Sequence, residues 1–199
     1  RDLTEWCVNL IPNEPSAFDD GSALQPVNQP VWGTCPNQVF DGEFYWTTGG
    51  STMVIKGTMS QAGTVTQPNG STFTIGPGNW TRTITQKGTY QLPMEHMTAL
   101  SFQDQSRQFF GFSPTFYTGA LTTMYRMFYN ADKFDNSDIS GWDTRNVTNM
   151  AEFAKNNGNF DTDLSGWDTS NVTNMFAAFS SAFNFNQDLN SWNTSSVVD

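Results

Sequence analysis

The C-terminal half of the chain contains a segment that returns almost unchanged. WDTRNVTNM at Trp142–Met150 is followed by WDTSNVTNM at Trp167–Met175 and then by WNTSSVVD at Trp192–Asp199. The tryptophans that open these segments are 25 residues apart both times. A fixed period in this range is typical of repeat proteins, in which one unit cannot bury its apolar face alone and stacks on the next. The sequence therefore predicts a solenoid of 25-residue coils in this half.

The repeat units share apolar columns when they are aligned on the methionine that closes each motif. An aromatic residue stands eight positions before each Met, and a phenylalanine stands ten positions after it. We expect these columns to point inward and to form ladders along the stack. The predicted repeat core is Phe116, Met124, Phe128, Phe134, Ile139, Trp142, Val147, Met150, Phe160, Leu164, Trp167, Val172, Met175, Phe179, Phe185, Leu189 and Trp192.

Each unit also carries signals for its backbone. Met127–Ala131 and Met175–Ala182 predict a short helical stretch per coil, and the W-D-T and V-T-N-M segments predict strand edges that pair in parallel. The first unit has Phe116-Tyr117-Thr118 in place of W-D-T and one extra residue after Phe134, which we expect to bulge as a loop. These departures fit a capping unit.

Polar columns run beside the apolar ones. They contain Asn146 and Asn171, Thr148 and Thr173, and Asn149 and Asn174. Side-chain amides and hydroxyls can hold stacked backbones in register by hydrogen bonding. The alternative is a flat threonine array that binds ice or glycans. Because asparagines interrupt the threonine column, the hydrogen-bonded ladder is favoured.

Residues 41–102 have the pattern of a small antiparallel sheet or sandwich. Short runs rich in Thr, Val, Ile and aromatic residues are separated by turn signals that contain Gly or Pro, such as Pro68-Asn69-Gly70. The predicted strands are Phe40–Trp46, Ser51–Met59, Gly63–Thr66, Ser71–Ile75, Asn79–Thr85 and Thr89–Leu92.

Residues 1–40 predict an extended, irregular arm, because prolines fix the backbone and remove donors. Trp6, Phe18 and Trp32 are its expected anchors. Cys7 and Cys35 are the two cysteines of the chain, and they lack the spacing of a redox or metal motif. We expect a disulfide between them that ties down the arm, with two buried free thiols as the alternative.

Residues 103–119 predict a junction crowded with aromatic side chains. Phe109, Phe110, Phe112, Phe116 and Tyr117 stand close together in a polar frame. They are expected to plug the first open coil of the repeats, because a stack of repeats needs a cap. The alternative is an aromatic platform for a ligand.

The repeat resembles a known family. The pattern NVTNMFxxAxxFNQDLxxWDTSxVxxM, nearly complete in Asn171–Val197, is similar to the repeats of BspA-like leucine-rich-repeat surface proteins and of related bacterial lipoprotein-type surface proteins. The resemblance covers residues 116–199 only. It implies a surface-exposed or secreted protein that takes part in adhesion or protein–protein contact. Similar repeats also occur in proteins of large viruses and phages.

Composition limits the classes of partner. The formal net charge is −10, with 9 basic and 19 acidic residues, so binding to nucleic acid or to an anionic membrane surface is disfavoured. No apolar run reaches the roughly 20 residues of a transmembrane helix. The low charged fraction of 14% implies a surface of Asn, Thr, Ser, Gln and Gly, which suits an extracellular, cell-surface or virion-surface location.

Catalysis is not expected. The carboxylate pairs Asp143/Asp168 and Asp161/Asp163 fit structural turns, and the single histidine, His96, cannot by itself supply a base, a nucleophile and an orienting group. No cofactor is expected, and the one alternative is calcium. Acidic residues recur in equivalent loops and could supply the oxygen ligands that calcium prefers. These candidates are Asp135, Asp138, Asp161, Asp163 and Asp188, and the alternative is a solvated acidic edge.

Asn79 is preferred as a glycosylation candidate over Asn146, Asn171 and Asn193, because the sequons of these three lie within the repeats. In a bacterial or phage protein the matches would be coincidental. The third repeat stops at Asp199, one residue before the expected Met. We expect either that the natural chain continues or that a partner covers this end.

Together these observations predict a mainly β protein with short helices: an arm (1–40), a β-sheet domain (41–102), a junction (103–119) and a BspA-like, leucine-rich-repeat-like solenoid (120–199). The expected function is non-catalytic adhesion or protein–protein interaction, with other proteins or surface glycans as partners. The alternative is a structural subunit of a virion, phage tail or surface filament that binds copies of itself.

Overall fold

The structure is a computed structural model that describes residues 41–105, 108–113 and 116–199. These residues lie within one compact unit, Phe40–Asp199. The predictions for the arm, including its aromatic anchors and the Cys7–Cys35 disulfide, lie outside the described residues. No helix in the described ranges is long and apolar enough to cross a membrane.

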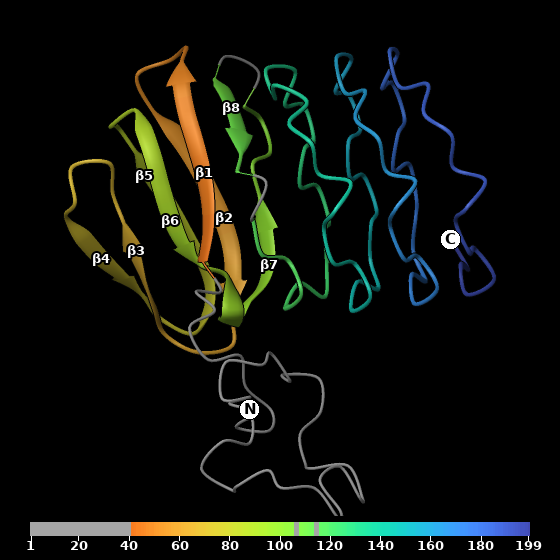
Figure 1. Cartoon of the computed structure of the whole chain (residues 1–199), viewed down its shortest axis with the longest axis horizontal. Coiled ribbons are helices and arrows are strands. Elements are labelled where there is room, and N and C mark those ends of the chain that lie inside the picture. The colour runs from red at the N-terminus through yellow and green to blue at the C-terminus, as the bar shows by residue number, and fades with distance from the viewer. Residues whose placement is uncertain (1–40, 106–107, 114–115) are drawn as a thin grey trace, which may run out of the picture. The chain divides into compact units, whose positions relative to one another are not determined.

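Two antiparallel sheets form the first part of this unit (Figure 1). One sheet has five strands in the order β4 (Thr72–Ile75), β3 (Gly63–Thr66), β6 (Gly88–Pro93), β1 (Asp41–Thr48) and β8 (Phe109–Phe112). The other has three strands in the order β5 (Gly78–Ile84), β2 (Met53–Met59) and β7 (Met97–Ser101). A 3-10 turn, η2 (Met94–His96), links β6 to β7.

The six strands predicted from the sequence correspond to β1–β6, with bounds that differ by at most two residues. Alternation explains this agreement, since one face of each strand packs on the core. In β2, for example, Met53, Ile55 and Met59 are buried. Sequence reasoning missed β7 and β8. No Gly or Asn signal marks the start of β7, because η2 leads into it directly, and β8 lies within the segment interpreted as a junction.

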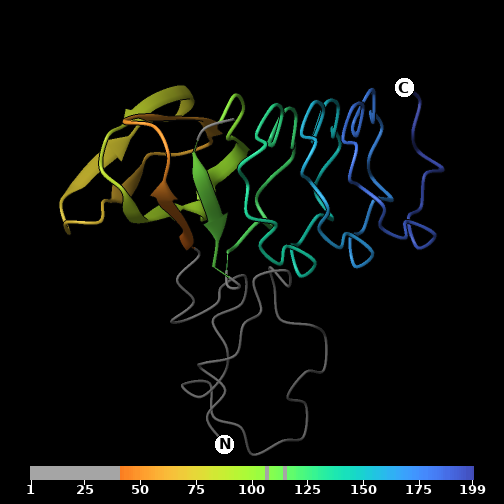
Figure 2. The same cartoon turned by 90° about the horizontal axis from the view of Figure 1, so that it is seen from above.

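The repeats follow as stacked layers of turns, which we call layer 1 (residues 116–141), layer 2 (142–166) and layer 3 (167–191) (Figure 2). Single-residue parallel bridges join them in series: Ala99 of β7 to Thr123, Thr123 to Asn149, and Asn149 to Asn174. A further parallel bridge joins Phe110 of β8 to Phe134. Layer 1 therefore covers edges of both sheets, which would otherwise be open for pairing.

The predicted leucine-rich-repeat-like solenoid with short helices is wrong. The regular secondary structure of the described residues is that of the two antiparallel sheets, with η2 and without any α-helix. Met127–Ala131 and Met175–Ala182 form turns, because residues at two fixed positions of each unit have positive φ. In layer 1 these are Arg126 and Asn130, and in layer 3 they are Ala177 and Ser181. A left-handed residue every four positions prevents a continuous helix.

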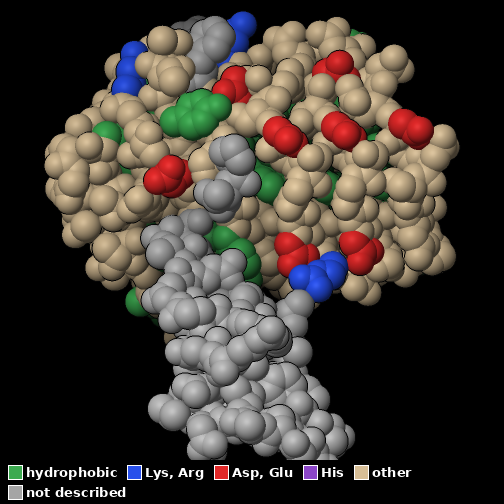
Figure 3. Space-filling view, viewed as in Figure 1, with side chains coloured by type: hydrophobic (Ala, Val, Ile, Leu, Met, Phe, Trp, Pro, Cys, Tyr) green, Lys and Arg blue, Asp and Glu red, His purple; other side chains and the backbone are tan. Residues whose placement is uncertain are grey.

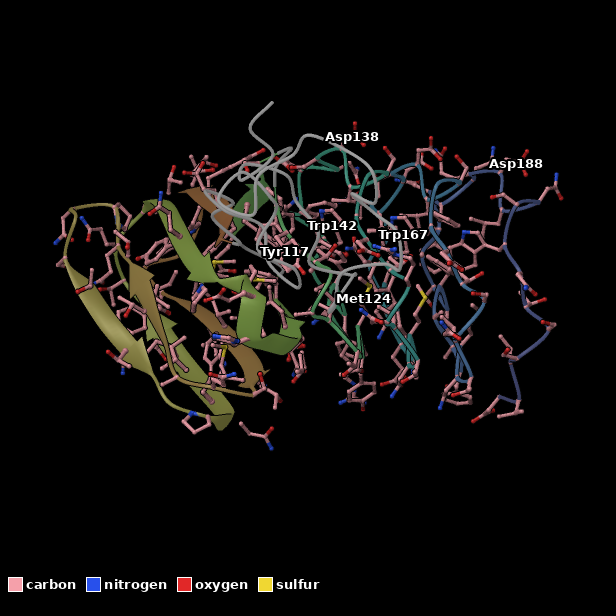
Figure 4. The ribbon with its side chains drawn as sticks, turned by 60° about the horizontal axis from the view of Figure 1, so that its bottom comes forward. Tyr117, Met124, Asp138, Trp142, Trp167 and Asp188 are labelled. Carbon is pink, nitrogen blue, oxygen red and sulfur yellow. The ribbon has the colours of Figure 1, made fainter. Side chains whose placement is uncertain are left out.

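Aromatic rings fill the interior of the layers. Figure 4 shows Trp142 and Trp167 from successive layers side by side, with ring centroids 6.1 Å apart and an interplanar angle of 9°. Of the predicted core, Met175, Phe179, Phe185, Leu189 and Trp192 are partly buried, and the other members are buried. Phe110, Phe112 and Phe116 of the predicted junction are also buried, and they contact the rings of Phe128, Phe134 and Trp142, respectively.

Phe153 is a core residue that the alignment of the repeat units did not predict. The column that holds Phe128 in layer 1 and Phe179 in layer 3 holds Ala154 in layer 2. The ring of Phe153, one position earlier, is fully buried and lies 5.3 Å from the Phe128 ring and 6.1 Å from the Phe179 ring. Layer 2 thus fills the same space from a neighbouring backbone position.

Candidate functional site

One face of the molecule carries a continuous row of small and polar side chains, which we call the polar row. It begins where Asn79 of β5 pairs with Thr58 of β2, and Thr58 pairs with Ala99 of β7. The parallel bridges carry it onward into the layers. Its members are Asn79, Thr58, Ala99, Thr123, Asn149 and Asn174.

A second row lies beside the polar row in the layers, and we call it the aromatic row. It consists of Tyr125, Ala151 and Phe176, each two residues after a member of the polar row. Local hydrogen bonds fix the relation between the rows. The Tyr125 N–H donates to the Thr123 hydroxyl, and the Ala151 and Phe176 N–H groups donate to the side-chain oxygens of Asn149 and Asn174.

A groove with a volume of about 490 Å³ lies over the sheet end of this face. Lys56 and Thr58 of β2, Asn79 and Thr81 of β5, and Tyr125 of layer 1 line it, together with Gly57, Trp80, Ala99, Leu100, Ser101, Gln103, Thr123 and Asn149. No Asp or Glu is among these residues, although the chain carries a formal net charge of −10. The groove is therefore a region free of carboxylates on an acidic protein.

Some polar groups of the groove already form hydrogen bonds within the protein. The Thr58 hydroxyl donates to the Asn79 side-chain oxygen at 2.7 Å, and the Ser101 hydroxyl donates to the Arg126 carbonyl at 2.8 Å. Within the described part of the chain, Lys56 Nζ and the Thr81 hydroxyl have no hydrogen-bond partner. They are available to a ligand that presents hydroxyl or carbonyl groups.

Close packing shapes the wall of the groove at Gly57. A Cβ atom at this position would lie 2.7 Å from both the Ala99 carbonyl oxygen and the Trp80 ring, so only glycine fits. The indole nitrogen of Trp80 is buried and has no partner among the described residues.

The Arg126 side chain packs against the Tyr125 ring. The Arg126 guanidinium lies 5.0 Å from the centroid of the Tyr125 ring and equally far from that of Tyr129. Its other contact is a hydrogen-bonded ion pair with the buried Glu152, which Lys155 also reaches at 2.5 Å. The hydrogen bonds from Lys155 and Arg126 lower the pKa of Glu152. Tyr125 is nevertheless 45% exposed, so a held ring faces solvent.

A second and larger hollow, of about 640 Å³, lies among turns of the layers at Asp132, Asn159 and Phe183. Its polar groups already connect the layers. The Asn159 amide donates to the Asp132 carbonyl, and the Asp132 carboxylate accepts from the Gly158 N–H. Because these groups hold the layers together, we take the groove beside Tyr125 as the candidate site.

The acidic candidates for calcium binding lie on the edges of the layers. Figure 4 shows Asp138 and Asp188 on the same edge, and Figure 3 shows acidic side chains set apart across the layers. Each of the five carboxylates is engaged in a hydrogen bond. Those of Asp138, Asp163 and Asp188 each accept from the backbone N–H two residues later.

The other two carboxylates make longer-range contacts. Asp135 accepts from the Tyr45 hydroxyl at 2.6 Å, and burial together with this contact raises the pKa of Tyr45. Asp161 accepts from the Gln187 amide and the Asn186 N–H, which lowers the pKa of Asp161. The described residues contain no group of three or more acidic, His or Cys side chains suited to a metal ion. Calcium binding stays a prediction.

The carboxylates considered for catalysis have structural partners as well. Asp143 forms an ion pair with Arg145 at 2.7 Å, and the hydrogen bond from Arg145 lowers the pKa of Asp143. Asp168 accepts from the Ser170 hydroxyl and backbone, which lowers its pKa. His96 lies 3.4 Å from Glu95.

The predicted ladder of polar side chains is confirmed in two of its three columns. The side chains of Asn146 and Asn171 donate to the carbonyls of Gly119 and Arg145, and those of Thr148 and Thr173 donate to the carbonyls of Thr122 and Thr148. The third column, Asn149 and Asn174, instead forms local turns and belongs to the polar row.

Sequence reasoning found Asn79 of the candidate site, as a sequon, but missed Lys56, Tyr125 and Phe176. Asn79 is exposed, and its glycosylation stays a prediction. A signal for the aromatic row was present in the repeats. The position after the motif methionine changes from Tyr to Ala to Phe, while the methionine before it is the same in all three units.

Comparison with known proteins gives a family without an assigned role. No curated protein and no solved structure matches the chain. Residues 96–199 match DUF285, a family described as a Mycoplasma protein of unknown function. Because this match includes β7, β8 and all three layers, and more than half of the 199 residues, the protein belongs to the DUF285 family.

Proposed function

We propose that the protein is a non-catalytic binding protein of a cell or particle surface, which uses the groove beside Tyr125 in adhesion or protein–protein contact. The observation that carries this proposal is the groove itself. It combines an exposed tyrosine, an unpaired lysine and several hydroxyl and amide groups, and no carboxylate lines it. A few polar groups beside an aromatic ring are typical of binding sites.

Two further observations support a binding role. The repeats resemble those of BspA-like surface proteins, whose members are associated with adhesion. The acidic residues considered for chemistry are held in turns or ion pairs, as expected of side chains that maintain the architecture.

An adhesion assay tests the proposal. The full chain is coupled to fluorescent beads, and the beads are applied to cell monolayers and to immobilised extracellular-matrix proteins. We expect beads to attach, and we expect the double variant Lys56→Ala with Tyr125→Ala to attach much less. Phe183→Ala removes an exposed ring outside the groove and serves as the control. Failure of the wild-type beads to attach to any surface, or equal attachment of the groove variant, would contradict the proposal.

A second function, as a structural subunit of an extracellular assembly, is favoured by exposed apolar side chains near the last layer. Phe183 is 85% exposed and Val198 is 86% exposed. Exposed apolar groups that gather into a patch can mark contacts between subunits. Analytical ultracentrifugation separates the two functions. A concentration-dependent assembly that Phe183→Ser abolishes supports the subunit, whereas a monomer at all concentrations supports the binding protein.

A further inference from the structure

The aromatic row places two exposed rings on either side of a small residue. The Arg126 N–H donates to the Ala151 carbonyl, and the Glu152 N–H donates to the Phe176 carbonyl, so Tyr125, Ala151 and Phe176 lie directly above one another in the stack. Tyr125 is 45% and Phe176 is 54% exposed, while Ala151 is 6% exposed. The surface therefore presents ring, gap and ring along the direction of stacking.

The spacing of these rings follows from the backbone. Layers joined by strand-like hydrogen bonds are about 4.8 Å apart, so positions two layers apart are separated by roughly 9.6 Å. This is close to the length of two linked pyranose rings. In a linear β-1,4-linked glycan, each ring is turned over relative to the one before it. Every second ring therefore presents the same face to one side, at the interval of the two aromatic side chains.

Other features of the face suit a sugar chain. The C–H groups of a pyranose pack well on an aromatic face, and Arg126 holds the Tyr125 ring in place before binding. The groove continues the line from Tyr125 with Ser101, Lys56 and Thr81, whose polar groups can bond sugar hydroxyls. Ala151 leaves room for the ring between the two stacked ones.

We propose that this face binds a linear β-1,4-linked glycan, with Tyr125 and Phe176 as stacking platforms for alternate sugar rings. This inference rests on the proposed binding function and names its ligand class. An extended peptide fits less well, because side chains on one face of a strand recur about every 6.8 Å, a shorter interval than that of the aromatic row.

Isothermal titration calorimetry on the full chain tests the inference, with cellohexaose and chitohexaose as probes and cellobiose as a short probe. We expect binding of at least one hexasaccharide. The disaccharide, which can reach only one platform, should bind about tenfold more weakly. Tyr125→Leu and Phe176→Leu should each weaken the binding of the hexasaccharide by about tenfold, since an aliphatic side chain lacks the flat face. Tyr125→Phe should retain it.

The matched control is Phe183→Leu, which alters an exposed ring outside the row and should leave affinity unchanged. Thermal unfolding checks that every variant folds. Absence of heat with both hexasaccharides overturns the inference, and so does an equal loss for Phe183→Leu. If the beads adhere through the groove but neither hexasaccharide binds, the proposed function stands and the glycan assignment falls. If neither adhesion nor binding occurs, both fall.

Discussion

The indole N–H of Trp167 donates a buried hydrogen bond of 2.9 Å to the backbone carbonyl of Ile139, near the end of layer 1. Trp192 repeats this bond at the same length, to the carbonyl of Leu164. In both cases the acceptor stands three residues before the equivalent aromatic position of the previous layer. The tryptophan ring therefore packs in the core, and its indole N–H also donates a hydrogen bond that links it to an earlier layer. Phenylalanine can provide only the packing.

Trp167→Phe should lower the free energy of unfolding by about 0.5–1.5 kcal/mol, because the Ile139 carbonyl loses one of its two donors and keeps the backbone N–H of Trp142, while a ring remains in the core. The measurement is urea denaturation followed by circular dichroism. Trp192→Phe is the matched control. Since Trp192 is only partly buried, water can replace its hydrogen bond, and the loss should be smaller. Equal losses at the two positions would contradict the role of burial.

Ala177→Gly should raise the free energy of unfolding by up to about 1 kcal/mol. Ala177 has φ of 53°, a conformation that costs an L-residue roughly 1–2 kcal/mol and glycine little. The greater freedom of glycine in the unfolded chain offsets part of this gain. Ala178→Gly is the control, because Ala178 is buried and is not among the positive-φ residues, so its replacement should destabilise. Melting temperatures of the two variants should therefore shift in opposite directions.

The same positive-φ residues show where prediction from sequence ends. The 25-residue period fixed the columns of the core, since burial follows the repeat pattern, and alternation located β1–β6. One left-handed turn position was not predictable from the sequence. It is occupied by Arg126 in layer 1, Glu152 in layer 2 and Ala177 in layer 3, and none of these residue types signals a left-handed turn. Of the six residues at these two fixed positions of the layers, only Asn130 and Asn156 are of a type that favours a left-handed turn.

Candidate-site prediction failed for a related reason. The groove is assembled by strand pairing between Lys56 and Thr81 and by stacking of Tyr125 beside β7, contacts between segments far apart in sequence. The acidic residues were considered as calcium ligands because they recur in each unit. Their recurrence is explained by turns, in which Asp138, Asp163 and Asp188 each accept a backbone hydrogen bond. Residues that repeat in every unit build the core and the turns of each layer. The candidate binding site instead uses a position that differs between layers.

Substitutions in layer 2 test whether Phe153 fills the space that Phe128 fills in layer 1 and Phe179 fills in layer 3. Phe153→Ala should cost about 3–5 kcal/mol, because a fully buried ring is replaced by a cavity between the Phe128 and Phe179 rings. Ala154→Phe alone should cost about 1–3 kcal/mol by overpacking. The double variant restores the arrangement of layers 1 and 3, so its loss should be smaller than that of Phe153→Ala. A purely additive loss, measured by urea denaturation, would show that the two positions do not share one space.

Stability should fall at low pH, and Glu152 should account for part of the loss. The hydrogen bonds from Lys155 and Arg126 lower the pKa of Glu152 in the folded protein. The unfolded chain, whose glutamates titrate near about 4.3, therefore takes up this proton at a higher pH than the folded protein does. The stabilisation is fully present above the unfolded pKa and is lost as the pH falls through the folded pKa.

Glu152→Gln should accordingly be less stable than the wild type near neutral pH, and the difference should shrink as the pH falls below about 4. Urea denaturation at a series of pH values measures this. A difference between Glu152→Gln and the wild type that stays constant from neutral to acid pH would show that the carboxylate acts through its shape and packing. In that case the ion pairs with Arg126 and Lys155 would contribute no stability of their own, and the hold on the Tyr125 ring would have to come from the cation–π contact alone.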